Sequence, residues 1–429
     1  MKRYESYKNS GVGWIGEIPS HWKVERLQSV ASCNDECLSE STLHNQEIEY
    51  VEIGNVDNVN GIRLTEKMLF ADAPSRARRI TKIGDIIVST VRTYLKAIAV
   101  IERDDLIVST GFAVIRPNHI NNKFIQIAML SDYFINSIVT NSYGVNYPAI
   151  TANKLIKLYI PIPPHSEQQA IVDYLKDKTL KIEQYVSARE RERELLSSLK
   201  QSEIANVVTK GLNPNVRMKD SGIPWIGMIP EHWETRTLSQ MARVHFISNK
   251  NVHHQNLLSL SYGKIVCKDI NTTEGLLPAS FDNYQIVEDG NIVLRLTDLQ
   301  NDHKSLRVGL STQEGIITSA YLAIEAFTGI LPKYLYFLLH SIDVKKVFYS
   351  MGNGLRQSLN WTELRKLKCI VPPILEQQAI VNYIEAKLSK IDSCMADLQA
   401  EIDYLKEFKQ RLISDVVTGQ ICVAEPQKG

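Results

Sequence analysis

The 429-residue sequence has few of the features that mark membrane proteins, metal proteins or enzymes. It contains no stretch of about 18 uninterrupted apolar residues, so we expect no membrane-spanning helix. The opening residues, Met-Lys-Arg-Tyr-Glu-Ser-Tyr, carry charges with no apolar core behind them, so we do not expect a signal peptide.

Cysteine is scarce and irregularly placed. The six cysteines show no Cys-x-x-Cys spacing. Cys33 and Cys37 lie near each other, but no second cysteine pair or His-x-x-x-His partner accompanies them, as a zinc site would require. We therefore expect no metal site, and we interpret the cysteines as free thiols of a cytoplasmic protein.

The motifs of nucleotide-binding enzymes and hydrolases are also missing. No Gly-x-Gly-x-x-Gly follows a predicted strand, and neither Gly-x-x-x-x-Gly-Lys-Ser/Thr nor Gly-x-Ser-x-Gly occurs. Asn213-Pro214-Asn215 departs from the Asn-Pro-Pro-aromatic motif of amino-methyltransferases. The formal net charge of +1 neither favours nor excludes a polyanionic partner, because local patches decide such binding. The sequence thus gives no support for a catalytic site.

What the sequence does contain is an internal duplication. Pro-Pro-x-x-Glu-Gln-Gln-Ala-Ile-Val begins at Pro163 and again at Pro372, 209 residues later. Trp-Ile-Gly-x-Ile-Pro-x-His-Trp begins at Trp14 and again at Trp225, and its two copies hold four of the five tryptophans. Prolines are tolerated where a helix begins but not in its interior. The repeats therefore predict two versions of one folded half, each followed by a long helix.

The tryptophan repeat has two interpretations. Its rings could form a platform for nucleic-acid bases, or they could pack each half together. We favour packing, because the glycines and prolines of the motif make turns while tryptophan and isoleucine supply apolar anchors. His21 and His232 would then belong to the same packed segment.

Each half has the pattern of a mixed α/β domain. In the first half, residues 84–91, 97–101, 106–115 and 157–162 predict strands, and residues 124–138 have helical spacing. Residues 290–294 and 316–321 repeat the strand pattern in the second half. The predicted fold class is α/β (α+β), with two similar mixed α/β domains.

Two long helices are expected at residues 166–208 and 375–418. Apolar residues recur at alternating intervals of four and three, which predicts a coiled coil between the two helices. Lys200 and Lys409 interrupt the two helices in the same register. Two halves joined through such helices predict a pseudo-twofold molecule with two globular parts held apart. The predicted coiled-coil interface consists of Leu175, Ile182, Val186, Leu196, Ile384, Leu388, Ile391, Leu398, Ile402 and Leu405.

A basic segment lies in the first half. Residues 76–96 contain six Lys or Arg against one Asp, with hydroxyl side chains among them. Arginine forks and hydroxyls suit phosphates and base edges, although such a run is also compatible with a plain solvated surface. The corresponding loop of the second half, residues 295–307, differs, as expected of two recognition modules for different targets or of neutral drift. The candidate DNA-binding residues are Arg76, Arg78, Arg79, Lys82, Arg92, Thr93, Tyr94, Lys96, Asn146, Tyr147, Arg295, Lys304, Arg307, Arg356 and Gln357.

The repeats resemble the specificity subunit of type I restriction–modification systems. The resemblance covers the whole chain and rests on the two motifs and on Asp-Val-Val-Thr-Gly at 415–419, which answers residues 206–210. It implies two target recognition domains, at 1–158 and 216–368, that each read one half of a split sequence in double-stranded DNA. It also implies that the helical regions 159–215 and 369–429 form an antiparallel coiled coil, which sets the spacing and binds two methyltransferase subunits.

The same resemblance implies a chain without catalysis or cofactors of its own. S-adenosylmethionine would be bound by the methyltransferase subunits, and ATP and Mg²⁺ by the motor-nuclease subunits. Two other functions compete with this one. The chain could be a duplicated scaffold that binds only proteins through its helices, or a nuclease that acts alone.

Overall fold

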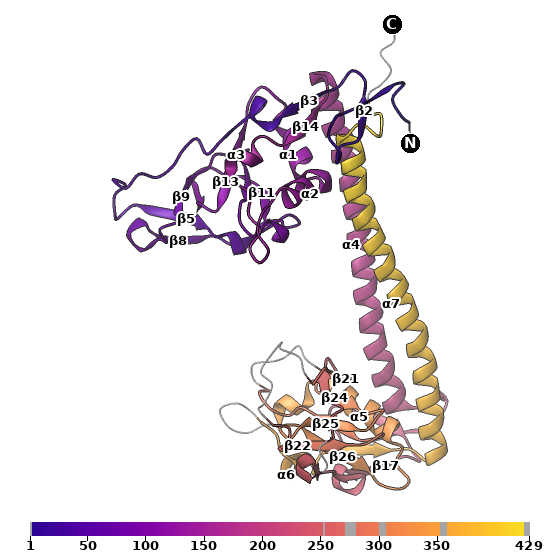
Figure 1. Ribbon diagram of the computed structural model, residues 1–429. Helices are drawn as coiled ribbons and strands as arrows, with labels where there is room; N and C mark the ends of the chain where they lie inside the picture. Colours follow the sequence, from indigo (N-terminus) through magenta and orange to yellow (C-terminus); the bar gives the residue numbers. More distant parts are fainter. Residues whose placement is uncertain (1, 252–253, 271–279, 300–305, 352–357, 424–429) are drawn as a thin grey trace. The chain divides into compact units, whose positions relative to one another are not determined.

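The computed structural model describes residues 2–251, 254–270, 280–299, 306–351 and 358–423 (Figure 1). The chain divides into two compact units, one formed by Met1–Arg189 with Ala400–Gly429 and the other by Glu190–Gln399. Helices α4 (His165–Lys210) and α7 (Ile374–Val417) each contribute to both units. We call these the first unit and the second unit.

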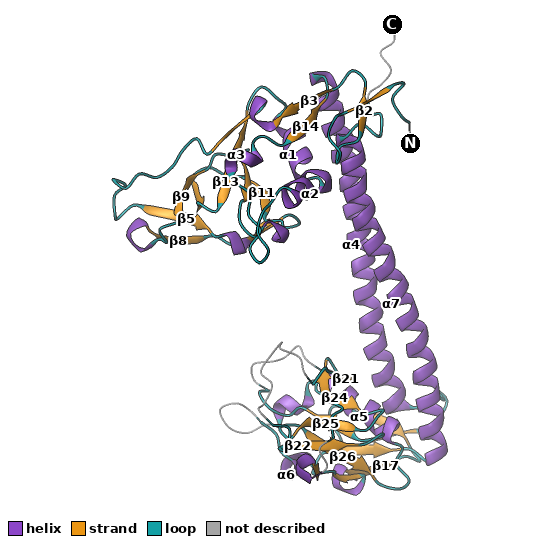
Figure 2. Ribbon diagram, in the orientation of Figure 1, coloured by secondary structure: helices purple, strands orange, loops and turns teal. Residues whose placement is uncertain are grey.

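The first unit contains two four-stranded sheets (Figure 2). The first sheet is antiparallel throughout, whereas the second contains one parallel pair, between β5 and β12. The first sheet has the order β11 (Ile98–Val100), β10 (Ile86–Ser89), β13 (Phe112–Pro117), β4 (Ala31–Cys33), and the second has the order β8 (Glu66–Leu69), β5 (Glu47–Val51), β12 (Leu106–Ser109), β9 (Ala77–Ile80). Shorter strand pairs are β1 (Tyr7–Asn9) with β2 (Glu17–Pro19), β3 (Lys23–Arg26) with β14 (Tyr159–Ile162), and β6 (Val56–Asp57) with β7 (Gly61–Ile62).

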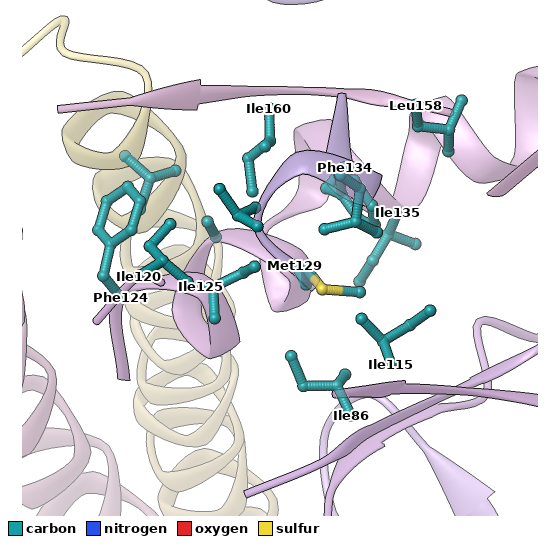
Figure 3. Packing of buried hydrophobic residues seen from close by; sticks show 14 of the residues in the cluster. Ile86, Ile115, Ile120, Phe124, Ile125, Met129, Phe134, Ile135, Leu158 and Ile160 are labelled. Carbon is teal, nitrogen blue, oxygen red and sulfur yellow. The ribbon is translucent and has the colours of Figure 1, made fainter. Parts of the chain in front are cut away.

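The central strands of the first sheet are buried on both faces. Alternate residues of a strand point to opposite faces, and the β-branched run of β10 therefore serves two cores. Ile86 packs with helices α1 (Asn122–Leu130) and α2 (Asp132–Thr140), whereas Ile87 belongs to a separate cluster with Val51 and Val108 of the second sheet. Figure 3 shows the helix-facing core, with Ile86 and Ile115 opposite Met129.

The second unit repeats this sheet with the same strand order. Its sheet runs β24 (Val308–Leu310), β23 (Ile292–Leu294), β26 (Leu322–Ala326), β18 (Ala242–Val244), again antiparallel throughout. Helix α5 (Pro332–Val344) supplies core residues where the first unit has α1 and α2. The remaining elements are β15 (Met218–Asp220) with β16 (Met228–Pro230), β17 (Glu234–Thr237) with β27 (Lys368–Val371), β19 (Ile247–Ser248), β22 (Tyr284–Val287) and β25 (Gly315–Thr318), β20 (Leu258–Ser261) with β21 (Lys264–Cys267), and α6 (Trp361–Leu364).

The predicted fold class is confirmed, but two expected elements of the first half are each divided. Residues 106–115 form β12 and β13, which belong to different sheets because the chain turns at Thr110 and Gly111. Residues 124–138 form two helices, because Ser131 has an extended backbone (ψ 149°) and its hydroxyl donates to the carbonyl of Ala128. The apolar periodicity continues through both breaks, so it could not reveal them.

The long helices pair antiparallel within each unit. In the first unit Lys409 near the end of α7 lies 2.6 Å from Glu183 near the start of α4. In the second unit Lys200 near the end of α4 lies 2.6 Å from Asp392 near the start of α7. The lysines share one register and so do their carboxylate partners, because the offset of 209 residues relates both pairs.

None of the ten predicted coiled-coil residues is exposed. The apolar seam is closed by side chains at intervals of three and four, as the heptad pattern requires. Six of these residues are buried and four are partly buried, the buried ones being Leu175, Ile182, Ile384, Ile391, Leu398 and Ile402 and the others Val186, Leu196, Leu388 and Leu405.

Candidate nucleic-acid interface

In each unit the two repeated motifs contact each other and join the sheet to the long helices. We call this contact the seat. In the first unit Trp22 is fully buried, and its indole Nε1 donates to Glu167 Oε2 at 3.0 Å. His21 Nε2 lies 2.6 Å from the other oxygen of the same carboxylate. Glu167 is the glutamate of the Pro-Pro-x-x-Glu motif, so one repeat holds the other.

The second unit has the same seat. Trp233 is fully buried and donates to Glu376 at 2.9 Å, and His232 lies 2.6 Å from that carboxylate. A fully buried indole cannot stack on a base. The packing interpretation is therefore confirmed for Trp22 and Trp233, and a base platform made of these two rings is ruled out.

The glutamine after each of these glutamates ties the helix to the recognition domain. Gln168 donates to the carbonyl of Pro163 and accepts from the backbone N–H of Asn121, both at 2.9 Å. Asn121 caps the start of α1, since its side chain accepts the N–H groups of residues 123 and 124. Gln377 does the same with Pro372 and Leu331 in the second unit. The seats thus fix the recognition sheets on a defined end of each helix.

Six candidate residues of the first unit lie where two loops pack together, and they are Arg92, Thr93, Tyr94, Lys96, Asn146 and Tyr147. One loop is the 3₁₀ turn η4 (Thr93–Leu95), which follows β10. The other connects α2 to α3 (Ala152–Leu155). Thr93 is buried and joins the loops, since its hydroxyl donates to Ser142 Oγ at 2.8 Å and its N–H donates to the carbonyl of Pro148 at 3.2 Å. The predicted DNA contact of the Thr93 side chain is therefore corrected to a supporting role.

The backbone is strained on both sides of the same turn. Arg92 and Lys96, on either side of η4, have φ values of +49° and +52°. Such left-handed conformations are uncommon for residues other than glycine and persist only where surrounding contacts impose them. Here they turn the arginine and lysine out of the strand direction at the end of β10.

Cations and aromatic rings alternate on the exposed side of these loops. The Arg92 guanidinium lies 5.0 Å from the centre of the Tyr147 ring, and Lys154 Nζ lies 3.7 Å from that of Tyr143. Tyr94 is half exposed. Cations fixed on aromatic faces form a preorganised surface that can take both phosphates and bases. We call it the loop surface, formed by Arg92, Tyr94, Lys96, Tyr143, Asn146, Tyr147 and Lys154.

A cleft of about 340 Å³ lies beside the loop surface. Its lining includes Arg79 of β9, Thr90 and Val91 directly after β10, and Ala149, two residues after Tyr147. The cleft therefore brings the arginine-rich strand to the two loops. Burial raises the pKa of the neighbouring Cys33 thiol to about 11, and the positive charge of Arg79 opposes this shift only partly.

Two other candidate cations of the first unit have partners within the protein. Lys82 forms an ion pair with Glu36, and hydrogen bonds from Lys82 and Arg116 lower the pKa of that carboxyl group. Arg78 lies 4.7 Å from the centre of the Phe70 ring and donates to the carbonyl of Ala77. Arg76 is exposed next to the cleft, where its carbonyl accepts from the N–H of Thr110.

In the second unit the predicted contact by Arg307 is wrong. Its side chain is fully buried, and its guanidinium donates to the carbonyls of Arg295, Thr297 and Asp298 at 3.2, 2.8 and 3.1 Å. It supports the loop after β23 from below and cannot face DNA in this conformation. The Arg295 side chain is partly buried. Three further candidates, Lys304, Arg356 and Gln357, lie outside the described residues.

The comparisons with known proteins point to type I restriction–modification systems. Residues 19–188 match the family model of the type I restriction modification DNA specificity domain, and this stretch includes the whole loop surface and the cleft. A putative type I restriction enzyme specificity subunit of Methanocaldococcus jannaschii, MjaX, is 22% identical over 95% of this chain and 96% of its own length. Residues 19–188 thus match a DNA specificity domain, and nearly the whole chain is similar to a type I specificity subunit. The role that this similarity supports is sequence-specific DNA recognition.

One more curated protein and two solved structures are also similar to the chain. The MjaVIII specificity subunit of the same organism is 25% identical over 51% of either chain. A chain from a structural study of the assembly and conformational transition of the type I R-M system superposes with a TM-score of 0.69 at 21% identity, covering 94% of this chain and 99% of its own. The HsdS subunit from Thermoanaerobacter tengcongensis superposes with a TM-score of 0.50 at 21% identity, covering 94% and 98%. The chain therefore shares the fold of these two structures.

Some residues of the loop surface were missed by sequence reasoning. Tyr143 and Lys154 were not among the candidates, although Tyr143 lies three residues before Asn146 and Lys154 seven residues after Tyr147. The tyrosines on both sides of Gly144 could have indicated Tyr143. Among the residues that the structure describes, no group of three or more His, Cys, Asp and Glu side chains is placed to hold a metal ion. In the same part, no helix has the length and apolar character needed to cross a bilayer.

Proposed function

We propose that this specificity subunit directs a type I restriction–modification complex to a split DNA sequence, with each unit reading one half. The proposal rests on one observation: the two units have the same framework of strands and helices but different loops. The strand order and the seat recur in both units, whereas the turn after β10 is an exposed basic loop and the turn after β23 is held by a buried arginine. Equal frames with unequal loops suit two readers of different half-sites.

In the first unit, the loop surface and the rim of the cleft would contact the DNA. Arg76, Arg79 and Lys96 would neutralise phosphates, and Arg92 with Asn146 would reach base edges. Arginine and asparagine make the forked hydrogen bonds that distinguish guanine and adenine in the major groove. In the second unit, Arg295 and the loop that it begins would take the corresponding role.

The long helices would set the distance between the two readers and bind two methyltransferase subunits. A paired coiled coil is stiff, and a bipartite target needs a fixed distance between its readers. The chain itself would be non-catalytic. The methyltransferase subunits would supply S-adenosylmethionine, and the motor-nuclease subunits would supply ATP and Mg²⁺.

The test is to sequence methylated bases in cells that express this chain with its methyltransferase subunit. We expect one bipartite motif. Arg92→Ala should relax one base of one half-site or weaken binding by about 1–3 kcal/mol, while the other half-site stays unchanged. Arg26→Ala is the matched control, because Arg26 is also exposed and lies 5.7 Å from the centre of the Tyr159 ring. If Arg92→Ala alters neither the methylated motif nor the binding of the target, the assignment of the loop surface is refuted.

Two control measurements test the two competing functions. If the chain were only a protein scaffold, the methyltransferase subunits would bind the target without it. If the chain were a nuclease, the purified protein would cut target DNA with Mg²⁺ alone. We expect neither result.

A further inference from the structure

The loop surface carries an apolar tip that its role in hydrogen bonding and phosphate binding does not explain. Between α2 and α3 the chain forms a hairpin in which Tyr143 and Ala149 exchange two backbone hydrogen bonds of 2.9 Å. The residue at its tip, Val145, is 98% exposed, and the rings of Tyr143 and Tyr147 are 73% and 65% exposed. Three neighbouring large apolar or aromatic side chains thus face solvent on one projection.

The hairpin is held by contacts on both sides. Gly144 has a φ of +113°, and a Cβ atom there would lie 3.0 Å from the carbonyl oxygen of Tyr147, so the turn is tight and needs glycine. The Ser142 hydroxyl donates to the carbonyl of Ile138, and Lys154 Nζ donates to the carbonyl of Asn141 at 2.7 Å. The tip is therefore anchored to helix α2 and to α3.

Positive charge surrounds the tip at its base. Arg92 and Lys154 lie on the two tyrosine rings, and both rings are thereby fixed with a cation beside them. The tip between β6 and β7 differs in charge. Val59 is 79% exposed there, and the carboxylate of Asp57 accepts the N–H groups beside it and forms an ion pair with Arg63. The cations at Tyr143–Tyr147 favour a polyanion, and the balanced pair beside Val59 favours it less.

We propose that the hairpin 143–147 is a wedge that enters duplex DNA, with Val145 inserted at a base step and Tyr143 and Tyr147 stacked on the bases next to it. Proteins that kink DNA insert rigid apolar side chains between base pairs while cations hold the adjacent phosphates. The inference rests on the proposed function, since it specifies how the first unit would contact its half-site. It adds a deformation of the DNA, and therefore a preference for an easily unstacked step, to the hydrogen-bond reading.

The test uses the full chain assembled with its methyltransferase subunits and a target duplex that carries 2-aminopurine, one position at a time, through the half-site read by the first unit. We expect the fluorescence to rise several-fold at one step on binding, because 2-aminopurine brightens when it is unstacked. Val145→Ser should reduce that rise by more than half while saturating protein still binds the target. Val59→Ser is the matched control and should change nothing.

The outcomes separate the wedge from the proposed function. Specific binding without a fluorescence rise at any position overturns the wedge and leaves the function standing. A rise that Val145→Ser leaves intact also overturns it. If Val145→Ser instead blocks assembly with the methyltransferase subunits, the hairpin is a protein contact and the wedge is wrong. Absence of sequence-preferring binding by the unmutated complex defeats the proposed function itself.

Discussion

The local contacts of each basic residue determine whether its side chain is buried or exposed. Arg92 follows β10 and Arg307 directly precedes β24, but Arg307 donates to backbone carbonyls in the interior whereas Arg92 is exposed and lies on the Tyr147 ring. Sequence spacing cannot separate the two cases, because the partners of Arg307 are carbonyl groups that every loop possesses. The consequence is that a recognition loop can depend on an arginine that never touches the target.

Arg307→Lys should therefore weaken the second unit from inside. A lysine cannot fork to three carbonyls, and we expect the free energy of unfolding to fall by about 3 kcal/mol. Chemical denaturation monitored by circular dichroism would measure this, with Arg243→Lys as the control, since Arg243 forms an exposed pair with Glu325. An equal effect of the two variants would contradict the supporting role of Arg307.

Much of the fold could be predicted at this scale, and the reasons are physical. The burial of positions such as Ile86, Trp22 and Ile384 can be predicted from residue type and spacing. The outward-facing residues do not, since Lys82 and Lys96 look alike in sequence while only Lys82 has its charge paired with Glu36. The seats stood out because the sequence repeats them, whereas the loops that carry the loop surface differ in sequence between the two halves.

At the scale of elements, the end of each long helix must pass close to a buried tryptophan. Gly419 and Gly211 follow α7 and α4 with φ values of +77° and +75°. A Cβ atom on Gly419 would lie 2.3 Å from Pro19 and 3.2 Å from Trp22, whereas one on Gly211 would lie 3.1 Å from Trp233. The glycines are thus part of the seats.

Alanine at these glycines should give a graded series. Gly227 has the same φ of +75° with nothing within 4 Å, so Gly227→Ala should show only the backbone strain, about 1 kcal/mol. Gly211→Ala should cost somewhat more, and Gly419→Ala should cost the most, about 3 kcal/mol or above, because proline cannot move aside easily. Thermal unfolding of the three variants measures the order, and equal losses would show that the tight contacts do not matter.

The lysines within the helical seam make a second prediction for elements. A polar residue at a seam position specifies register at a cost in stability. Lys200→Leu should therefore raise the free energy of unfolding by about 1 kcal/mol, because Asp392 remains half exposed to water when its partner is lost. Lys390→Leu, on the exposed side of α7, is the control and should give no gain. A loss of stability in Lys200→Leu would mean that the ion pair outweighs apolar burial.

At the scale of the whole molecule, the proposed spacing role can be tested by lengthening the helices. Seven residues inserted after Arg189 in α4 and seven after Gln399 in α7 keep the seam intact and add about 10 Å, or about three base pairs. We expect methylation at targets with the original spacing to be lost. Any motif that is then methylated should keep both half-sites and have a longer spacer. Unchanged methylation would contradict the spacing role, and insertion in one helix alone is the control for a broken register.

The two seats also differ in one hydrogen bond. The Tyr4 hydroxyl donates to Glu167 at 2.9 Å, and burial together with that carboxylate raises the pKa of Tyr4. The side chain of Glu167 is 13% exposed, but that of Glu376 is 41% exposed, and among the described residues Glu376 contacts only His232 and Trp233 in this way. The two halves should consequently differ in the temperature at which they begin to unfold locally. Deuterium should enter the amides around Trp233 before those around Trp22. The seat of the second unit would then be the less stable of the two.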